Sequence, residues 1–227
     1  MNSEQYRKFR ESLGNNVTLV AVSKLQAVSS IRHLYNFGHR DFGENYVQEL
    51  IEKQLLLPPD INWHFIGHLQ SNKIKYIAPF VHLVHSVDSF KLLLEIDRQG
   101  KKIDKRINCL LQVHIASEDT KYGLHAEELD EMINGITRAA DVNTMNNVLV
   151  AGLMGMATFT DDNDTVSSEM KYLSALYEKY SHINTSNIRF QYLSMGMSAD
   201  YKQAIEAGSN MVRVGSLVFG ERKQPLV

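Results

Sequence analysis

Short apolar segments alternate with amphipathic helical patterns along almost the whole chain, and this alternation limits the possible fold more than any other feature. The predicted strands are residues 17–22, 40–42, 62–66, 81–86, 107–115, 148–153, 188–193 and 210–214. The predicted helices are residues 3–13, 29–37, 46–57, 71–77, 89–99, 125–139, 163–181 and 198–207, followed by a terminal turn at 217–221. Strict strand–helix alternation indicates parallel strands joined by right-handed crossovers, so we predict the α/β class.

Eight such units within 227 residues favour a (β/α)8 TIM barrel with an extra N-terminal helix. The chain is slightly shorter than the about 250 residues typical of that fold. A doubly wound open sheet is the alternative, although eight units would be many for it. No GxGxxG motif follows the first strand, so the dinucleotide-binding version has no support. We therefore expect a single barrel domain over residues 1–227.

Several residues are predicted to mark the ends of helices. Gly38 is expected just beyond the helix that follows the first strand, where glycine tolerates a left-handed conformation. Asp88 is expected to cap the helix after the fourth strand, and Gly100 to close it. Ser198 is expected to begin the helix after the seventh strand.

The charge balance and the single cysteine exclude several classes of protein. With 24 basic and 26 acidic residues there is no basic excess, which argues against a nucleic-acid-binding protein. Cys109, the one cysteine, lies in an apolar run and cannot form a disulfide within the chain, so a reducing compartment fits best. The N-terminus is polar, and no apolar run approaches the roughly 20 residues of a membrane span. We expect a cytoplasmic protein without membrane contact.

Lys24 follows a strand that is apolar or β-branched throughout, Val17–Val22. A partly desolvated amine has a lowered pKa, and its neutral form can attack an aldehyde to give a Schiff base. The alternative is that the lysine extends from the strand end into solvent. This segment alone leaves both interpretations open.

Glycine and small polar residues collect at the carboxyl ends of the predicted strands, the rim that carries the active site in barrels. After the seventh strand, Gly196 and Ser198 precede a helix whose first N–H groups lack helical partners. After the eighth strand, Gly215 and Ser216 would let the backbone approach a ligand closely. Each segment alone reads equally as a turn with a helix cap. Together, on neighbouring strands, they favour a phosphate site.

Arg213 lies within the otherwise apolar eighth strand, and a buried arginine needs an acceptor. A core carboxylate or the ring nitrogen of a ligand would serve. Asn45 and His64 also lie near the rim, although a lone histidine such as His64 is more often a core residue. Nine histidines raise the question of a metal, but neither HxH nor HExxH occurs, and we expect no metal site.

Seven segments follow one another in order along nearly the whole chain. They are LVAVSK (19–24), DFGENYVQE (41–49), WHFIGHLQSNK (63–73), HSVDS (85–89), GLM (152–154), LSMGMSADYKQAIEAGS (193–209) and VRVGSLVFGER (212–222). In these segments the sequence resembles the YggS/PROSC family, called pyridoxal phosphate homeostasis proteins. In QVHIASEDTKYG (112–123), His114 stands where the family usually has asparagine, and Ser216 stands where it commonly has threonine.

The resemblance implies a fold-type III barrel, like the N-terminal domain of alanine racemase without its second domain. It implies that pyridoxal 5′-phosphate (PLP) is the cofactor and that Lys24 forms the internal aldimine. It also assigns the other cofactor-binding positions: Ser198, Gly215 and Ser216 at the phosphate, Arg213 at the pyridine nitrogen, and Asn45 beside the cofactor. A guanidinium only donates hydrogen bonds, so it would keep that nitrogen unprotonated and weaken the electron sink.

Two functions follow as hypotheses. The first is a protein that holds PLP as a lysine aldimine, limits its free concentration and delivers it to PLP-dependent apoenzymes, acting in intracellular vitamin B6 homeostasis as a monomer without robust catalytic activity. The second is a PLP-dependent amino-acid racemase or related lyase. The second needs an acid/base on the ring face opposite Lys24, and the sequence offers no clear candidate for that role beyond a tyrosine such as Tyr46.

Overall fold

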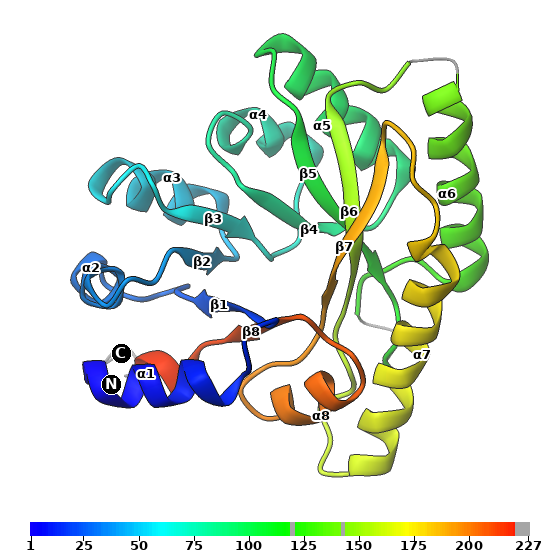
Figure 1. Ribbon diagram of the computed structural model, residues 1–227. Helices are drawn as coiled ribbons and strands as arrows, with labels where there is room; N and C mark the ends of the chain where they lie inside the picture. The colour runs from blue at the N-terminus through cyan, green and yellow to red at the C-terminus, as the bar shows by residue number, and fades with distance from the viewer. Residues whose placement is uncertain (119–120, 142–143, 221–227) are drawn as a thin grey trace.

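The strands of the computed structural model, which describes residues 1–118, 121–141 and 144–220, close into a parallel barrel (Figure 1). They are β1 (Thr18–Val22), β2 (Asp41–Glu44), β3 (Asn62–Phe65), β4 (Leu83–Val87), β5 (Ile107–Val113), β6 (Val148–Gly155), β7 (Ile188–Ser194) and β8 (Met211–Val214). Each strand pairs with the next in chain order, and β8 pairs with β1, with Leu19 opposite Val212. The predicted (β/α)8 barrel is therefore confirmed, and the open sheet is excluded.

Helices cover the outside of the barrel. They are α1 (Ser3–Ser12), α2 (Val28–Asn36), α3 (Val47–Leu56), η1 (Ser71–Lys73), α4 (Ile74–Ile77), α5 (Phe90–Lys102), α6 (Ala126–Asp141), α7 (Asn163–Ser181), α8 (Tyr201–Glu206) and α9 (Ser216–Phe219). The predicted order of strands and helices is reproduced throughout the described residues. Glu221, at the end of the predicted terminal turn, and the last residues of the 212–222 motif lie outside them.

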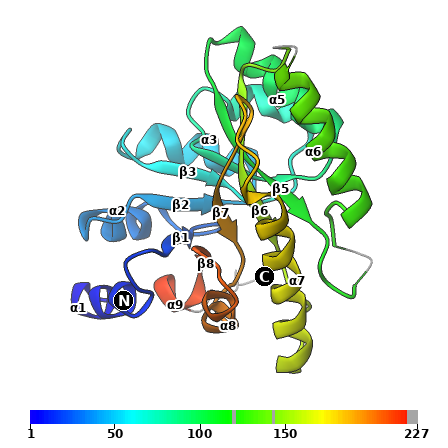
Figure 2. The same ribbon diagram turned by 45° about the vertical axis from the view of Figure 1, so that its right-hand side comes forward.

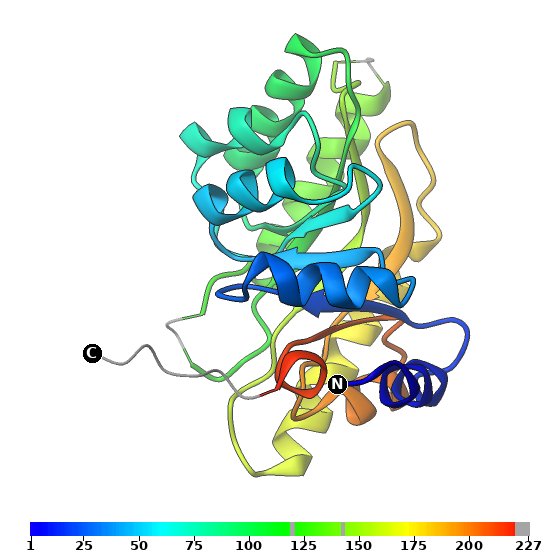
Figure 3. The same ribbon diagram turned by 90° about the vertical axis from the view of Figure 1, so that its left-hand side faces the viewer.

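The extra N-terminal helix, α1, packs beside the last helices of the chain, α8 and α9. Figure 2 shows α1, α8 and α9 gathered below β1 and β8, and Figure 3 shows α9 beside the N-terminus. The rings of Phe9 and Tyr201 meet edge to face with centroids 5.6 Å apart. Tyr6 is buried, and its hydroxyl forms a 2.9 Å hydrogen bond with Nδ1 of His39. The predicted helix is thus part of the packed fold.

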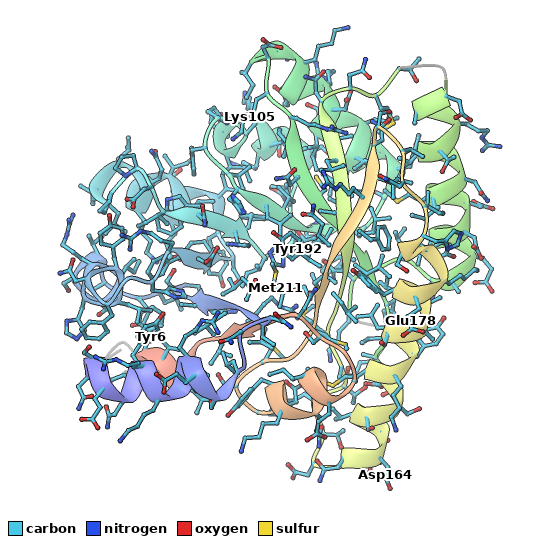
Figure 4. All side chains as sticks on the ribbon, viewed as in Figure 1. Tyr6, Lys105, Asp164, Glu178, Tyr192 and Met211 are labelled. Atoms are coloured by element: carbon cyan, nitrogen blue, oxygen red, sulfur yellow. The ribbon has the colours of Figure 1, made fainter. Side chains whose placement is uncertain are left out.

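Two apolar layers result from the alternation of side chains along the strands. The larger layer lies between strands and helices and includes the buried side chains of Phe42, Phe65 and Leu173. The smaller layer fills the barrel with Val20, Leu83, Leu110, Ala151, Met154 and Met211. Figure 4 labels Met211 and, partly buried against the same cluster, Tyr192, near the centre of the barrel. Thus the inside of this barrel is a packed core.

Three predicted helix ends differ from the structure. Ser89, not Asp88, caps α5, because its hydroxyl accepts the N–H of Leu92. The helix continues past Gly100 to Lys102, so Gly100 does not end it. A glycine is needed at this position for a different reason. A methyl group there would lie 2.6 Å from the carbonyl oxygen of Lys105 and 2.8 Å from that of Asn147. Close approach of two backbones therefore explains this residue.

Ser198 lies in a turn and does not begin a helix, since α8 starts at Tyr201. Gly38, in contrast, follows α2 with φ of 91°, as predicted. Cys109 is fully buried in the outer apolar layer, and burial raises the pKa of its thiol. None of the helices in the described ranges combines the length and the apolar character needed to cross a membrane.

Candidate functional site

A cavity of about 980 Å³ opens at the carboxyl ends of β1, β6, β7 and β8. Five of the six residues predicted from the sequence line it: Lys24, Ser198, Arg213, Gly215 and Ser216. Val22, Ala157 to Asp161 and Met197 to Asp200 complete much of the wall. Residues more than 170 positions apart in the sequence therefore meet, as expected for the catalytic rim of a barrel.

Asn45 lies elsewhere. It lines a separate cavity of about 490 Å³ together with Tyr46, Lys73 and Tyr76. Its side-chain oxygen Oδ1 is buried and has no hydrogen-bond partner among the described residues. The structure therefore does not bring the Asn45 side chain together with the other five residues, and its role beside a cofactor stays a prediction.

The backbone on both sides of Lys24 is held by a buried ion cluster, which we call the Lys53 cluster and which consists of Lys53, Glu44 and Glu49. The Lys53 amine donates to the carbonyl oxygen of Ser23 at 2.6 Å and to Oε1 of Glu44 and of Glu49, each at 2.7 Å. Glu44 also accepts the Ser23 hydroxyl at 2.5 Å, and Glu49 accepts the N–H of Leu25 at 2.6 Å. Every residue next to Lys24 is thus fixed.

Two members of the Lys53 cluster are charged groups removed from solvent. Glu44 is fully buried and Lys53 is 5% exposed. Burial raises the pKa of Glu44, while the charge of Lys53 opposes that increase. Leu25 adopts a left-handed conformation with φ of 61°, which is uncommon for a side chain of this size. The cluster accordingly maintains a strained turn immediately after Lys24. Sequence analysis missed it, although the four-residue spacing of Glu49 and Lys53 on one helix was a usable signal.

The loop after β7 and the loop after β8 together form one wall of the cavity. The N–H of Gly215 donates to the hydroxyl oxygen of Ser198 at 3.3 Å, which ties the loop after β7 to the loop after β8. Within the described part of the chain, the backbone N–H groups of Ser198, Ala199 and Ser216 have no partner. All three residues line the cavity. Backbone N–H groups without a partner in a cavity wall suit a phosphate.

Arg213 reaches the cavity from inside the barrel and is 4% exposed. Its Nη1 donates to the carbonyl oxygen of Ser194 at 2.8 Å and to the Ser194 hydroxyl at 2.7 Å, and its Nη2 donates to the carbonyl oxygen of Gly155 at 2.9 Å. These acceptors are neutral, so no core carboxylate pairs with it among the described residues. Burial lowers the pKa of Arg213 to about 10, against the charge of Asp200, which raises it.

A guanidinium has five N–H donors, and three of those of Arg213 are used by the protein. No described residue accepts from Nε or from the second proton of Nη2. Arg213 lines the cavity, and its two unused donors can serve a ligand that reaches them. A neutral ring nitrogen is a suitable acceptor.

His114, the departure from the family pattern, lines a smaller neighbouring cavity of about 480 Å³ with Asp88, Lys121 and His125. Its Nε2 lies 3.0 Å from the carbonyl oxygen of Glu118. It is therefore outside the main cavity. Among the described residues, no group of three or more histidine, cysteine or acidic side chains could hold a metal ion.

Comparison with known proteins identifies one family over the whole barrel. The family described as "Alanine racemase, N-terminal domain" matches residues 3–223. A protein of Aquifex aeolicus named "Pyridoxal phosphate homeostasis protein" is 36% identical over 224 residues, which are 97% of this chain and 95% of that protein. The human protein of the same name is 36% identical over 217 residues, 90% of this chain and 76% of that protein.

Solved structures agree with the barrel. PipY of Synechococcus elongatus, solved with PLP bound, superposes with a TM-score of 0.84 at 31% identity, over 96% of this chain and 99% of that one. The alanine racemase of Clostridium difficile superposes with a TM-score of 0.74 at 14% identity, over 99% of this chain and 57% of that one. The second likeness concerns the fold alone.

Proposed function

Because the chain belongs to the family of the alanine racemase N-terminal domain, we propose that it binds PLP in the main cavity and takes part in intracellular PLP homeostasis. One cavity brings together a lysine, a buried guanidinium and unpaired backbone N–H groups. These groups match the three polar features of PLP, its aldehyde, its ring nitrogen and its phosphate. Relatives that carry the homeostasis name, and PipY with PLP bound, support the choice of ligand.

Lys24 is the residue that would hold the aldehyde. Its amine would attack the aldehyde carbon, a C=N bond would form and one water would leave, giving a Schiff base. The Lys53 cluster supports this role, because it fixes Ser23 and Leu25 and so sets the direction in which Lys24 leaves the strand. A reversible covalent bond also allows the cofactor to be released again.

The remaining residues would orient the cofactor. The hydroxyls of Ser198 and Ser216 and the unpaired N–H groups of their loops would bind the phosphate, beside Gly215. Arg213 would donate to the ring nitrogen and keep it unprotonated. Bound PLP supplies an electrophilic carbon and an electron sink, and an arginine partner leaves that sink weak. This arrangement suits a holder of PLP whose reactivity is kept low.

Similarity to the homeostasis proteins favours this function over amino-acid racemisation. The two relatives above are each 36% identical to the chain, whereas the alanine racemase is 14% identical. Tyr46, the acid/base considered for racemisation, lines the Asn45 cavity. Delivery to apoenzymes, a monomeric state and a single PLP-binding domain over residues 1–227 remain part of the proposal.

Borohydride labelling tests the proposal directly. The purified protein, incubated with PLP, is expected to absorb in the visible range, and reduction should label Lys24 as located by mass spectrometry. Lys24→Ala should abolish the label while the matched variant Lys73→Ala, altered in the Asn45 cavity, retains it. A wild-type protein that stays colourless and unlabelled would overturn PLP binding, and a labelled Lys24→Ala variant would overturn the assignment of Lys24.

Exchange of the α-hydrogen separates the two functions. The holoprotein is incubated with single amino acids in heavy water, and deuterium incorporation is followed by NMR. A homeostasis protein should give no more exchange than free PLP at the same concentration. Enzyme-like exchange that depends on Lys24 would establish the racemase or lyase function.

A further inference from the structure

A line of polar side chains crosses the otherwise apolar inside of the barrel and ends at Arg213. It consists of Asp41 at the start of β2, His64 on β3, His85 on β4 and Ser194 at the end of β7, and we call these four residues the core relay. His64, His85 and Ser194 are at most 1% exposed. Burying a polar group costs free energy unless the group is hydrogen-bonded. Each buried polar atom of the core relay therefore needs a hydrogen-bond partner.

Short contacts link the core relay from end to end. Nε2 of His64 lies 3.1 Å from Oδ1 of Asp41, and Nδ1 of His64 lies 2.9 Å from Nε2 of His85. Nδ1 of His85 lies 3.3 Å from the Ser194 hydroxyl, which accepts from Nη1 of Arg213 at 2.7 Å. The chain therefore connects a carboxylate on one strand with the guanidinium in the cavity, across five strands of the barrel.

With both imidazoles neutral, the carboxylate end determines the direction of every hydrogen bond in the core relay. Arg213 can only donate, and an ionised carboxylate such as Asp41 can only accept. His64 then donates through Nε2 to Asp41 and, as a neutral ring, accepts at Nδ1 from Nε2 of His85, which as a neutral ring accepts at Nδ1 from the Ser194 hydroxyl. All ring nitrogens are satisfied with both imidazoles neutral.

The surroundings of His85 and Asp41 favour a neutral ring and an ionised carboxylate. Burial lowers the pKa of His85 well below its usual value, so a neutral ring is favoured. Burial alone would raise the pKa of Asp41, but hydrogen bonds from His64 and Asn62 lower it overall. Asn62 donates to the same oxygen at 3.1 Å and so holds the carboxylate toward the barrel.

We propose that Asp41, His64, His85 and Ser194 are positioning residues that orient Arg213 from within the barrel, so that its Nε and its second Nη2 proton face the ring nitrogen of the ligand. The negative charge of Asp41 makes each acceptor along the chain stronger, and the last of these acceptors is the one that holds Nη1 of Arg213. This proposal rests on the proposed function, since it concerns the same cavity.

The first test uses the protein without cofactor, so that it is independent of PLP binding. Long-range ¹⁵N–¹H NMR of the histidine side chains, assigned with single-site variants, reports which ring nitrogen carries the proton. His64 and His85 are both expected as neutral rings protonated at Nε2 near neutral pH. A proton on Nδ1 of either ring, or a doubly protonated His85, would overturn the relay.

The second test measures coupling along the relay in the holoprotein. Ser194→Ala, which removes the link to Arg213, should weaken PLP binding about five-fold. Asp41→Asn should weaken PLP binding by a smaller factor. Both variants should shift the ¹⁵N resonance of the PLP ring nitrogen, and in the same direction. Adding Asp41→Asn to Ser194→Ala should then have no further effect on either quantity.

Asp60→Asn is the matched control, because Asp60 precedes β3 and pairs with Arg40 and Tyr35 outside the relay. It should leave the PLP dissociation constant and the ring-nitrogen resonance unchanged. Equal effects of Asp41→Asn and Asp60→Asn, or additive effects of Asp41→Asn and Ser194→Ala, would overturn the positioning role. Failure of the wild type to bind PLP would instead overturn the proposed function.

Discussion

Arg213 keeps its positive charge in a place where most arginines would have a carboxylate partner. Its acceptors are the Ser194 hydroxyl and two backbone carbonyl groups, and burial leaves its pKa at about 10. At neutral pH the group is therefore still protonated and acts only as a donor. A carboxylate in its place would favour a protonated ring nitrogen, which would make bound PLP a stronger electron sink.

Gly196 illustrates how one residue can set the shape of the loop after β7, which carries Ser198. Its φ is 94°, in the left-handed region, and a methyl group there would lie 2.5 Å from Cβ of Ala204 and 3.1 Å from Cα of Tyr201. Gly208 has a similar φ of 100°, but the nearest atom to its added methyl group would be the Ser174 hydroxyl oxygen at 3.2 Å. The two glycines differ mainly in the space around them.

Gly196→Ala is predicted to destabilise the protein by about 2–4 kcal/mol, from left-handed strain together with overpacking against α8. It should also weaken phosphate binding, because the loop carrying Ser198 must move. Gly208→Ala should cost only about 1–2 kcal/mol, the strain alone. Urea unfolding and titration with inorganic phosphate measure both effects. Equal losses of stability in the two variants would contradict the role of the contact with α8.

At the scale of elements, α3 supports the turn after β1 through the Lys53 cluster. Lys53 lies on α3, Glu44 ends β2, and both reach Ser23 in the turn after β1. Three elements therefore meet beneath Lys24. Because Lys53 and Glu44 are buried, removal of the single cation leaves the Glu44 carboxylate without compensation.

Lys53→Met is predicted to destabilise the protein by roughly 3–5 kcal/mol, the cost of an unpaired buried charge. It should also slow the formation of the Lys24 adduct with PLP under conditions where the variant is folded, since Ser23 loses its donor. Lys179→Met is the control, because Lys179 pairs with Asp130 at the surface with both side chains about half exposed. An exposed pair contributes only about 0–1 kcal/mol. Chemical unfolding that gives the two variants equal stability would contradict this prediction.

At the scale of the whole molecule, buried histidines make the fold sensitive to acid. Burial lowers the pKa of His39 to about 4, and it also lowers the pKa of His82 and of His85. Between pH 6.5 and about pH 4 the unfolded chain binds a proton at His39 that the folded protein does not. The free energy of unfolding must therefore fall as the pH falls through this range.

His39 alone should account for about 3 kcal/mol of that loss, at 1.36 kcal/mol per pH unit. In His39→Gln, the slope of unfolding free energy against pH between pH 4 and 6.5 should decrease by the equivalent of one proton, whatever the change at neutral pH. His182→Gln, at an exposed helix end, should leave the slope unchanged. Urea unfolding at a series of pH values gives both slopes, and an unchanged slope in His39→Gln would contradict the assignment.

The sequence by itself determined the barrel and the side of it on which five site residues lie. Alternating apolar strands and amphipathic helices leave little choice of topology, and parallel strands place all their carboxyl ends on one rim. Lys24, Ser198, Gly215 and Ser216 follow a strand and Arg213 is the next-to-last residue of one, so they had to meet there. The direction of each strand was enough to place these residues at that rim.

Only the tertiary structure decided where Asn45 points, what holds Lys24 and what orients Arg213. The core relay joins residues up to 153 positions apart, and its link from His85 to Ser194 crosses the barrel between β4 and β7, which are not neighbouring strands. The irregular pairing of β4 with β5 between Val84 and Val87 further breaks the simple alternation from which faces are assigned. Side-chain direction across a barrel depends on stagger and bulges, which local sequence patterns do not encode.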